Sequence, residues 1–199
     1  LAICRGESGG GDGPDELNDT RNTQPALFVI ESLLVDGLLA QGRAASVIAG
    51  HSLGEFSALV CAESLEFADA VVLVRNRGRY MQEAVPVGTG AMAAILGLEE
   101  NKVDSICAEC TRKRTNGLIV KAVNYNSPAQ VVIAGHSELV DEAIDALKDA
   151  GAKRAMLLPV SAPFHTPLMS SAGEQLAISM EDITFKEPTI DVLSNVNAD

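Results

Sequence analysis

The chain has 199 residues, 47% of them hydrophobic, which suits one domain of moderate size or a domain that carries a smaller insert. Its formal net charge of −12 argues against a general nucleic-acid-binding protein, so we expect no nucleic acid among its partners. Since no apolar run approaches the roughly 18 residues that cross a bilayer, we also expect no membrane contact.

The first predicted helix follows a loop over residues 1–22 that is rich in glycine and charge. Thr23-Gln24-Pro25 is typical of a helix start, because proline suits the first helical turn. Gly42 is the expected end of this helix. Its apolar face, at helical spacing, is expected to consist of Leu27, Ile30, Leu34 and Leu38.

A junction between a strand and a helix comes next. The apolar run Val47-Ile48-Ala49 is expected to end a buried strand, and Gly50-His51-Ser52-Leu53-Gly54-Glu55 follows it directly. A serine between glycines at such a junction is typical of a nucleophile elbow, because glycine permits the tight turn that exposes the hydroxyl. A glycine-rich turn with an incidental serine, and a phosphate-binding loop, are alternatives that the motif alone leaves open. The helix after the junction is indicated by the spacing of Phe56, Leu59, Val60 and Glu63.

A third helix is expected from about Ala68 to Glu83, and a different pattern follows it. Strands are expected at residues 91–96, 118–123, 130–134 and 155–160, with a turn at Asn126-Ser127-Pro128. One helix is expected at residues 101–114, and another begins with Ser137 as its cap and ends at Gly151. The order β-α-β-β-α-β is that of a ferredoxin-like module, which predicts an inserted subdomain over residues 87–161.

The isolated C-x-x-C pair in this insert, Cys107 and Cys110, is predicted to pack in the core. A structural zinc site needs about four ligands, and no second cysteine pair or suitably spaced histidine accompanies it, so no metal is expected. Together with Val103 and Ile106, the pair falls at i, i+3, i+4 and i+7, the spacing of a core stripe on a helix. The four cysteines of the chain indicate a reducing compartment, and we predict the cytoplasm.

After the insert, the chain returns to the larger pattern. Ala162-Pro163-Phe164-His165 is expected to form a loop, followed by a helix over residues 168–180 and a strand over residues 190–193.

Several segments together resemble the acyltransferase family of fatty acid and polyketide synthesis, the malonyl-CoA:acyl-carrier-protein transacylases. These segments are Asn22-Thr23-Gln24-Pro25-Ala26-Leu27, Gly50 to Glu55, Arg77-Gly78-Arg79-Tyr80-Met81-Gln82, Gly88-Thr89-Gly90-Ala91-Met92, Asn124-Tyr125-Asn126-Ser127-Pro128 and Ala162-Pro163-Phe164-His165. The resemblance runs from about Glu16 to the last residue. It implies an α/β fold in which residues 1–86 and 162–199 form an α/β-hydrolase-like core with a parallel sheet, and this core carries the ferredoxin-like subdomain.

The chain departs from the family pattern at both ends. Family members usually open with a strand that ends in G-Q-G-x-Q and supplies one oxyanion-hole amide, and this segment is absent here. They also continue well beyond Asp199, where the residue that orients the catalytic histidine lies. The resemblance therefore implies an acyltransferase truncated at both ends, which by itself is a weak catalyst or an inactive one.

A serine hydroxyl needs a base at neutral pH, and the chain has three histidines. His51 adjoins Ser52 and would point away from it in an extended elbow, and His136 is expected at the end of a strand. His165 matches the catalytic histidine of the family, and the resemblance implies that it acts as general base and then as general acid. Ser52 is the predicted nucleophile, and the backbone N–H of Leu53 is the predicted oxyanion-hole donor.

Arg77 is predicted to bind the free carboxylate of a malonyl group, because a guanidinium can hold a carboxylate by two parallel hydrogen bonds. One more surface arginine is the alternative. Phe164 resembles the phenylalanine that excludes an α-methyl branch, or it simply packs in its loop. Met81 is predicted to line the acyl pocket, with core packing as the alternative. Asn126 either contacts the pantetheine arm or makes an Asx-turn.

The resemblance implies transfer of a malonyl group from coenzyme A to the phosphopantetheine thiol of an acyl carrier protein, by a ping-pong route through a serine ester. No cofactor is implied, because the coenzyme A thioester is itself the substrate. Arg112-Lys113-Arg114 is a candidate dock for the acidic carrier, and a solvated helix end is the alternative. Two other functions stay open: an α/β-hydrolase that acts as an esterase or thioesterase, and an inactive acyltransferase fragment.

Overall fold

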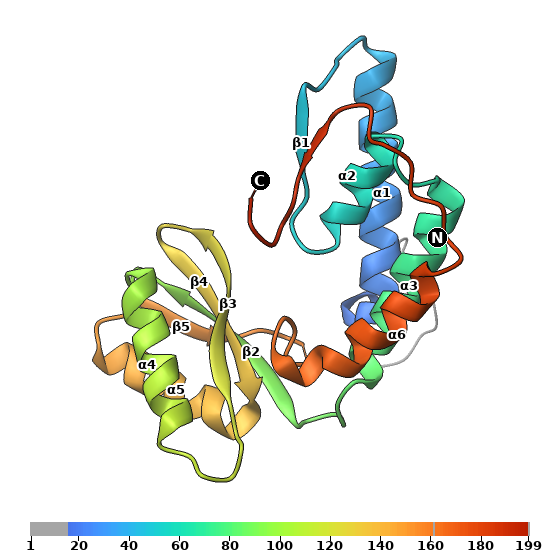
Figure 1. Ribbon diagram of the computed structural model, residues 1–199. Coiled ribbons are helices and arrows are strands. Elements are labelled where there is room, and N and C mark those ends of the chain that lie inside the picture. The colour runs from blue at the N-terminus through green and yellow to red at the C-terminus, as the bar shows by residue number, and fades with distance from the viewer. Residues whose placement is uncertain (1–15, 161, 199) are drawn as a thin grey trace. The chain divides into compact units, whose positions relative to one another are not determined.

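The computed structural model describes residues 16–160 and 162–198, and the chain forms two compact units. The first unit comprises Leu1–Tyr80 and Gln175–Asp199, and the second unit comprises Met81–Glu174. The first contains a parallel pair of strands and the second an antiparallel sheet, so the predicted α/β class is confirmed (Figure 1).

The first unit combines helices with two short parallel strands (Figure 1). Strand β1 pairs with β6 so that Val47 lies opposite Asp191 and Ala49 opposite Leu193. The two strands therefore end side by side. The elements of this unit are η2 (Glu16–Asn18), α1 (Thr20–Ala40), β1 (Val47–Ala49), α2 (Gly54–Cys61), most of α3 (Phe67–Glu83), the end of α6 (Ser170–Met180) and β6 (Asp191–Leu193).

Helix α1 begins at Thr20, three residues before the predicted start at Thr23. The reason is an N-cap that the prediction missed: the Asp19 side chain accepts a hydrogen bond of 2.9 Å from the backbone N–H of Arg21. The side-chain hydrogen bonds from Arg21 also lower the pKa of the Asp19 carboxyl. Pro25 consequently lies further inside the helix instead of in its first turn.

The predicted apolar face of α1 is not its buried face. Among the described residues, Leu27, Ile30, Leu34 and Leu38 are 46%, 49%, 63% and 51% exposed. The helix instead buries Thr20, Gln24 and Phe28, which are spaced four residues apart. Apolar residues occur all round this helix, so their spacing could not single out one face. The β1 strand was also expected to be buried, yet Val47 is exposed, because the described residues provide only β6 as its neighbour.

Helix α1 is also the one described helix that is long and apolar enough to cross a membrane, with a mean hydropathy of 1.4. Its acidic residues interrupt the apolar run, which is why the sequence suggested no such segment. Core helices of soluble proteins meet the same criterion, so this feature is weak support for a membrane span.

The core of the first unit lies where α1, α2 and α3 meet. The ring of Phe28 is fully buried and stacks on Phe67 with 5.3 Å between the ring centroids. Helix α3 closely matches the helix predicted from Ala68 to Glu83. The buried apolar residues of this core are Phe28, Leu53, Phe56, Leu65, Ala70, Leu73 and Val74. The core thus includes the residue that follows the predicted nucleophile.

The second unit is a four-stranded antiparallel sheet of order β3-β4-β2-β5, covered by α4 and α5 (Figure 1). Gly90 of β2 lies opposite His136 of β4, and Ala93 of β2 lies opposite Leu157 of β5. The elements are β2 (Gly90–Leu96), α4 (Glu100–Arg112), β3 (Val120–Ser127), β4 (Gln130–His136), α5 (Ser137–Asp149), β5 (Arg154–Leu157) and η3 (Pro167–Met169).

The C-x-x-C pair lies in the core of this unit, as predicted. Cys107 is 1% exposed and Cys110 is 4% exposed, and both pack with residues of α5 and the sheet. Burial raises the pKa of the Cys107 thiol to about 12, so the thiol stays protonated at neutral pH. These cysteines therefore behave as small apolar side chains.

Two local predictions in this unit were wrong. The expected turn at Asn126-Ser127-Pro128 is displaced, because β3 continues through a register shift until Ser127 pairs with Gln130. Ser137 does not cap α5 but is its first residue, preceded by His136. Its hydroxyl instead donates a hydrogen bond of 2.8 Å to the carbonyl oxygen of Gly88.

Candidate functional site

The turn between β1 and α2 has the backbone geometry of a nucleophile elbow. Ser52 has a φ of 55°, in the left-handed region that L-residues rarely adopt. A Cβ on Gly50 would lie 2.0 Å from the carbonyl carbon of Gly54, so the turn has no room for a side chain there. At Gly54 itself a Cβ would meet nothing within 4 Å. The first glycine is therefore required sterically, and the second is not.

We expect Gly50→Ala to destabilise the protein by about 1–3 kcal/mol or more, because the added methyl group can be placed only if the backbone of the elbow moves. Gly54→Ala is the matched control in the same turn, since its Cβ would project into open space. Urea unfolding of the two variants measures the difference in free energy. Equal midpoints for both would contradict the close approach of Gly50 to Gly54.

A second contact holds the elbow from a distant part of the chain. The backbone N–H of Ser52 donates a hydrogen bond of 2.9 Å to Oδ1 of Asn195, which lies 143 residues further on. The backbone N–H of Asn195 donates a bond of 3.1 Å to Oε1 of Glu55. The sequence carried no signal for Asn195, because nothing local relates it to the elbow. Glu55, in the first turn of α2, anchors this loop.

Arg77 reaches the predicted nucleophile. Its Nη2 donates a hydrogen bond of 3.0 Å to Oγ of Ser52, and its Nη1 donates one of 2.5 Å to Oε1 of Gln24. Gln24 is 6% exposed, and its Nε2 donates a bond of 2.8 Å to the hydroxyl of Thr20. Gln24 belongs to a segment that carries the family resemblance, although the sequence alone indicates no role for it. The buried stripe of α1 thus orients the guanidinium.

Close packing of α3 on α1 makes this contact possible. A Cβ on Gly78, the residue after Arg77, would lie 2.6 Å from the carbonyl oxygen of Thr20. The helices can approach this closely only because the residue is glycine. The short approach places the Arg77 guanidinium within reach of Gln24.

The electrostatic setting of Arg77 suits an anion. Burial lowers the pKa of its guanidinium, while the negative charge of Glu55 opposes that shift. An arginine remains charged at neutral pH even so. The site therefore holds a partly desolvated cation beside a serine hydroxyl, which can bind a carboxylate close to that hydroxyl.

Leu53 follows the nucleophile and occupies the N-cap position of α2. Its side chain is 7% exposed and packs in the core of the first unit. The next amides, of Gly54 and Glu55, donate to the carbonyl oxygens of His51 and Ser52 at 3.0 Å and 3.3 Å. These bonds start the helix and fix the peptide planes around Leu53.

His165 lies in the second unit, on a well-defined loop. It is exposed and has a φ of 61°. The hydroxyl of Thr166 donates a bond of 2.7 Å to the carbonyl oxygen of Pro163 and accepts one of 3.3 Å from the amide of Leu168. A Cβ on Gly90 would lie 2.2 Å from Cδ of Pro163, so this loop also depends on a glycine. Ser52 and His165 belong to different units, and their pairing stays a prediction.

The other predicted site residues also lie in the second unit. Phe164 is half-buried and packs against a cluster formed by Met92, Val132 and Ala134, which favours the loop-packing alternative. Met81 is 7% exposed, in keeping with its core-packing alternative. Asn126 is exposed on β3, and its side-chain amide lies 3.4 Å from Oε1 of Gln130, so it makes a contact across the hairpin.

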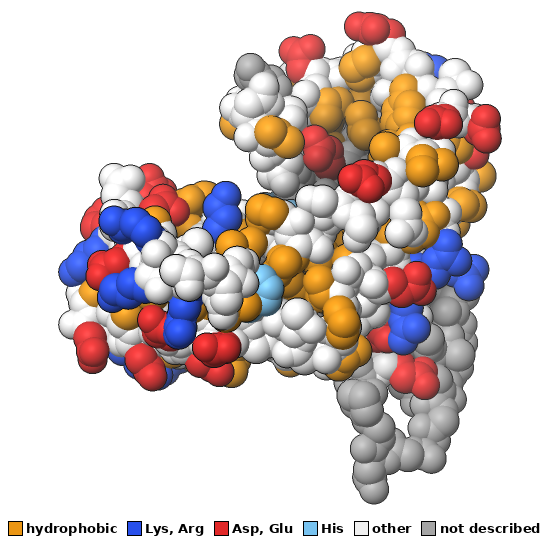
Figure 2. Space-filling view, turned by 60° about the horizontal axis from the view of Figure 1, so that its bottom comes forward, with side chains coloured by type: hydrophobic (Ala, Val, Ile, Leu, Met, Phe, Trp, Pro, Cys, Tyr) orange, Lys and Arg blue, Asp and Glu red, His pale blue; other side chains and the backbone are white. Residues whose placement is uncertain are grey.

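The basic segment Arg112-Lys113-Arg114 is largely neutralised within the second unit. Nζ of Lys113 lies 2.9 Å from Oε1 of Glu109, and Arg114 forms ion pairs with Glu138 and Glu142. Figure 2 shows acidic and basic side chains interspersed over the surface of this unit. The contacts favour the alternative of a solvated helix end over a dock for an acidic carrier.

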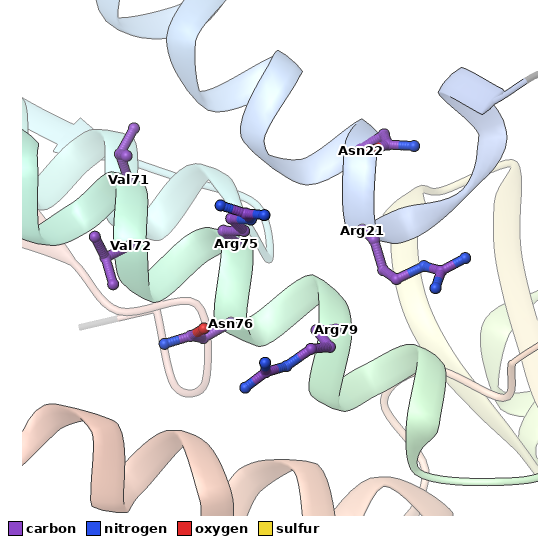
Figure 3. Close-up of a pocket in the computed structure, with 7 residues that line it drawn as sticks. All are labelled: Arg21, Asn22, Val71, Val72, Arg75, Asn76 and Arg79. Atoms are coloured by element: carbon purple, nitrogen blue, oxygen red, sulfur yellow. The ribbon is translucent and has the colours of Figure 1, made fainter. Parts of the chain in front are cut away.

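A separate basic cavity of about 600 Å³ lies in the first unit, between the start of α1 and the outer side of α3 (Figure 3). Arg21 in its wall is paired with Asp19, and the guanidinium carbon of Arg79 lies 5.0 Å from the ring centroid of Tyr80. Neither Ser52 nor Arg77 lines this cavity, so it is distinct from the elbow. Its lining residues are Arg21, Asn22, Val71, Val72, Arg75, Asn76 and Arg79.

Comparison with known families and proteins identifies close relatives. A family model described as an acyl transferase domain matches residues 11–199. The malonyl CoA-acyl carrier protein transacylase of Escherichia coli (strain K12) is 53% identical over 184 residues, which cover 92% of this chain and 58% of that protein. The protein of the same name from Staphylococcus aureus (strain COL) is 42% identical over 183 residues, with coverage of 92% and 58%.

Solved structures give the same result. The malonyl CoA-acyl carrier protein transacylase from Coxiella burnetii has a TM-score of 0.88 and 47% identity, covering 94% of this chain and 58% of that chain. A malonyl-transacylase in complex with a type II PKS acyl-carrier protein has a TM-score of 0.88 and 49% identity, covering 94% and 60%. The chain thus spans less than two thirds of the length of these relatives.

Proposed function

The chain belongs to the acyl transferase domain family, and from that premise we propose that the protein transfers a malonyl group from coenzyme A to the phosphopantetheine thiol of an acyl carrier protein. The observation that carries the proposal is the hydrogen bond of 3.0 Å between Arg77 and Ser52. A hydrolase of neutral esters has no use for a partly buried arginine at its nucleophile. A malonyl ester, in contrast, carries its free carboxylate one methylene away from the acyl carbon that the serine attacks.

In the first half-reaction, Oγ of Ser52 attacks the thioester carbonyl of malonyl-CoA while Nε2 or Nδ1 of His165 takes the hydroxyl proton. The C–S bond then breaks, the malonyl group stays on Ser52 as an ester, and the coenzyme A sulfur leaves with the proton from His165. The backbone N–H of Leu53 donates to the oxyanion. Loss of one such donor raises the barrier by about 2.7–4 kcal/mol in a well-studied enzyme, so a second donor matters.

In the second half-reaction, the thiol of the carrier's phosphopantetheine gives its proton to His165 and attacks the malonyl ester. The C–O bond to Ser52 breaks, and the protonated histidine returns a proton to the serine oxygen. No cofactor takes part in either half-reaction. The chemistry needs only a nucleophile, a base, oxyanion donors and a cation for the carboxylate.

The clamp for the malonyl carboxylate consists of Arg77 oriented by Gln24. The bond from Nη1 to Gln24 prevents the guanidinium from rotating freely, and this leaves Nη2 directed toward the serine. A neutral acyl group would leave this partly buried cation without a counter-charge, which disfavours such a group. On family resemblance, we assign Phe164, Met81 and Asn126 to the acyl and pantetheine paths, in addition to the packing and hairpin contacts that they make within the second unit.

The proposal also covers the subdomains, the cellular location and the binding partners of the protein. We propose that residues 87–161 form a ferredoxin-like subdomain within an α/β-hydrolase-like core of residues 1–86 and 162–199. The sheet order β3-β4-β2-β5 and the element order β2-α4-β3-β4-α5-β5 support this. We propose a cytoplasmic protein that binds neither nucleic acid nor a membrane.

The test is a comparison of transfer with hydrolysis. When the protein is incubated with malonyl-CoA, we expect added pantetheine thiol or holo-carrier to receive the malonyl group faster than water does. Mass spectrometry of the acceptor and of released malonate measures the two rates. If hydrolysis dominates at saturating thiol, the protein acts as a thioesterase and the proposal fails.

A further inference from the structure

The turn that follows β6 lies beside the elbow because of the parallel pairing of β1 and β6. Ala49, the last residue of β1, is opposite Leu193, the last residue of β6. Chains that leave parallel strands do so at the same edge of the sheet. Ser52 and Asn195 each follow within a few residues, so strand pairing alone brings these two residues to one edge.

The β6 turn is itself ordered by local hydrogen bonds. The hydroxyl of Ser194 accepts a bond of 3.2 Å from the amide of Val196, and its carbonyl oxygen accepts one of 2.9 Å from the amide of Ala198. These bonds shape the turn so that Asn195 presents both its side chain and its backbone N–H to the first residues after β1. The contact to Ser52 comes from Oδ1, because a backbone N–H requires an acceptor.

We propose that Asn195 is a positioning residue for the nucleophile. Its Oδ1 accepts a hydrogen bond from the amide of Ser52 and its own amide donates to Glu55, so Asn195 bridges two residues of the turn in which Ser52 has its left-handed φ. A fixed peptide plane before Ser52, together with its φ of 55°, sets the direction in which the Ser52 side chain leaves the backbone. The inference rests on the proposed function only in so far as it takes Ser52 to be the nucleophile.

Glu55 connects Asn195 with Arg77, the residue proposed to select the malonyl group. Its carboxylate accepts a hydrogen bond from the Asn195 amide, and its charge acts on the partly buried Arg77, whose Nη2 donates to the hydroxyl of Ser52. Ser52 is therefore held at its amide by Asn195 and at its hydroxyl by Arg77. Asn195 orients the nucleophile, and Arg77 binds the carboxylate of the malonyl ester that the nucleophile forms.

The experiment measures the reactivity of Ser52 in a way that does not require malonyl chemistry. An alkyl phosphonyl fluoride forms an O–P bond with the serine oxygen, fluoride leaves, and the hydroxyl proton passes to the base. We expect Asn195→Ala to slow this labelling by about tenfold or more. The same variant should lower kcat for malonyl transfer while KM for malonyl-CoA stays unchanged, since Arg77 is intact.

Two companion variants separate positioning from a general structural effect. Asn195→Asp keeps an oxygen acceptor and should restore most of the labelling rate. Asn197→Ala removes an exposed asparagine of the same turn and should label at the unaltered rate. Unchanged labelling of Asn195→Ala overturns the inference, and so does a loss that Asn195→Asp does not restore. A protein that labels normally but transfers no malonyl group refutes the proposed function and leaves the inference standing.

Discussion

Replacing Ser52 by alanine should abolish the covalent malonyl-enzyme and lower transfer on the order of 10³-fold or more, because no other group takes over the nucleophilic role. The expected result is visible in the intact mass of the protein after exposure to malonyl-CoA: the unaltered protein gains one malonyl group and Ser52→Ala gains none. The reason is structural as well as chemical, since Ser52 is the residue that the elbow holds at a φ of 55°.

Two further variants sharpen this prediction. Ser57→Ala is the matched control on α2, because Oγ of Ser57 donates to the Glu31 carboxylate and has no part in the proposed reaction. Ser52→Gly should be as inactive as Ser52→Ala but more stable than it by about 1 kcal/mol, because glycine adopts a left-handed conformation without steric strain. A malonyl adduct on Ser52→Ala would show that the nucleophile lies elsewhere.

Replacing Arg77 by alanine should reverse the preference of the protein for malonyl over acetyl groups. Breaking a buried charge pair costs about 3–5 kcal/mol, which corresponds to a loss of about 10²–10⁴-fold in kcat/KM for malonyl-CoA. Acetyl-CoA has no carboxylate to lose, so its rate should hold or rise. The ratio of the two kcat/KM values, measured with the same carrier, is the quantity that decides the assignment.

Arg75 provides the matched control for Arg77. It lies on the same helix, is exposed, and lines the basic cavity on the outer side of α3. Arg75→Ala should therefore leave the malonyl-to-acetyl ratio unchanged. Gln24→Ala should lower the ratio less than Arg77→Ala does, because the cation remains but loses its orientation. An unaltered ratio in Arg77→Ala would refute the role of this arginine as a carboxylate clamp.

Much of the fold could be predicted because it follows from local patterns. Helix α3 and the core position of the C-x-x-C pair were recovered from apolar spacing within single elements. Three of the errors have a common cause. The cap at Asp19, the hydroxyl contact of Ser137 and the register shift before Ser127 depend on hydrogen bonds that apolar spacing does not encode.

In the candidate site, too, some residues could be predicted from local sequence patterns and others could not. Ser52 could be predicted because the elbow signature is contained in six consecutive residues, and the φ of 55° agrees with it. Arg77 was assigned by resemblance, and its bond to the Ser52 hydroxyl supports that assignment. The role of Gln24 could not be predicted, because the apolar residues of α1 indicated a buried face that does not include it.

By itself, the sequence determined the residue types of the elbow and the α/β class of the chain, whereas the structure showed that glycine is required at position 50 and not at position 54. Only the tertiary structure decided which face of α1 is buried, that Gln24 orients Arg77, and that Asn195 holds the serine from 143 residues away. The physical reason is the range of the interactions involved. Turn sterics and helical periodicity act within a few residues, whereas the site is completed by hydrogen bonds between segments that meet only when α1, α3 and β6 have packed.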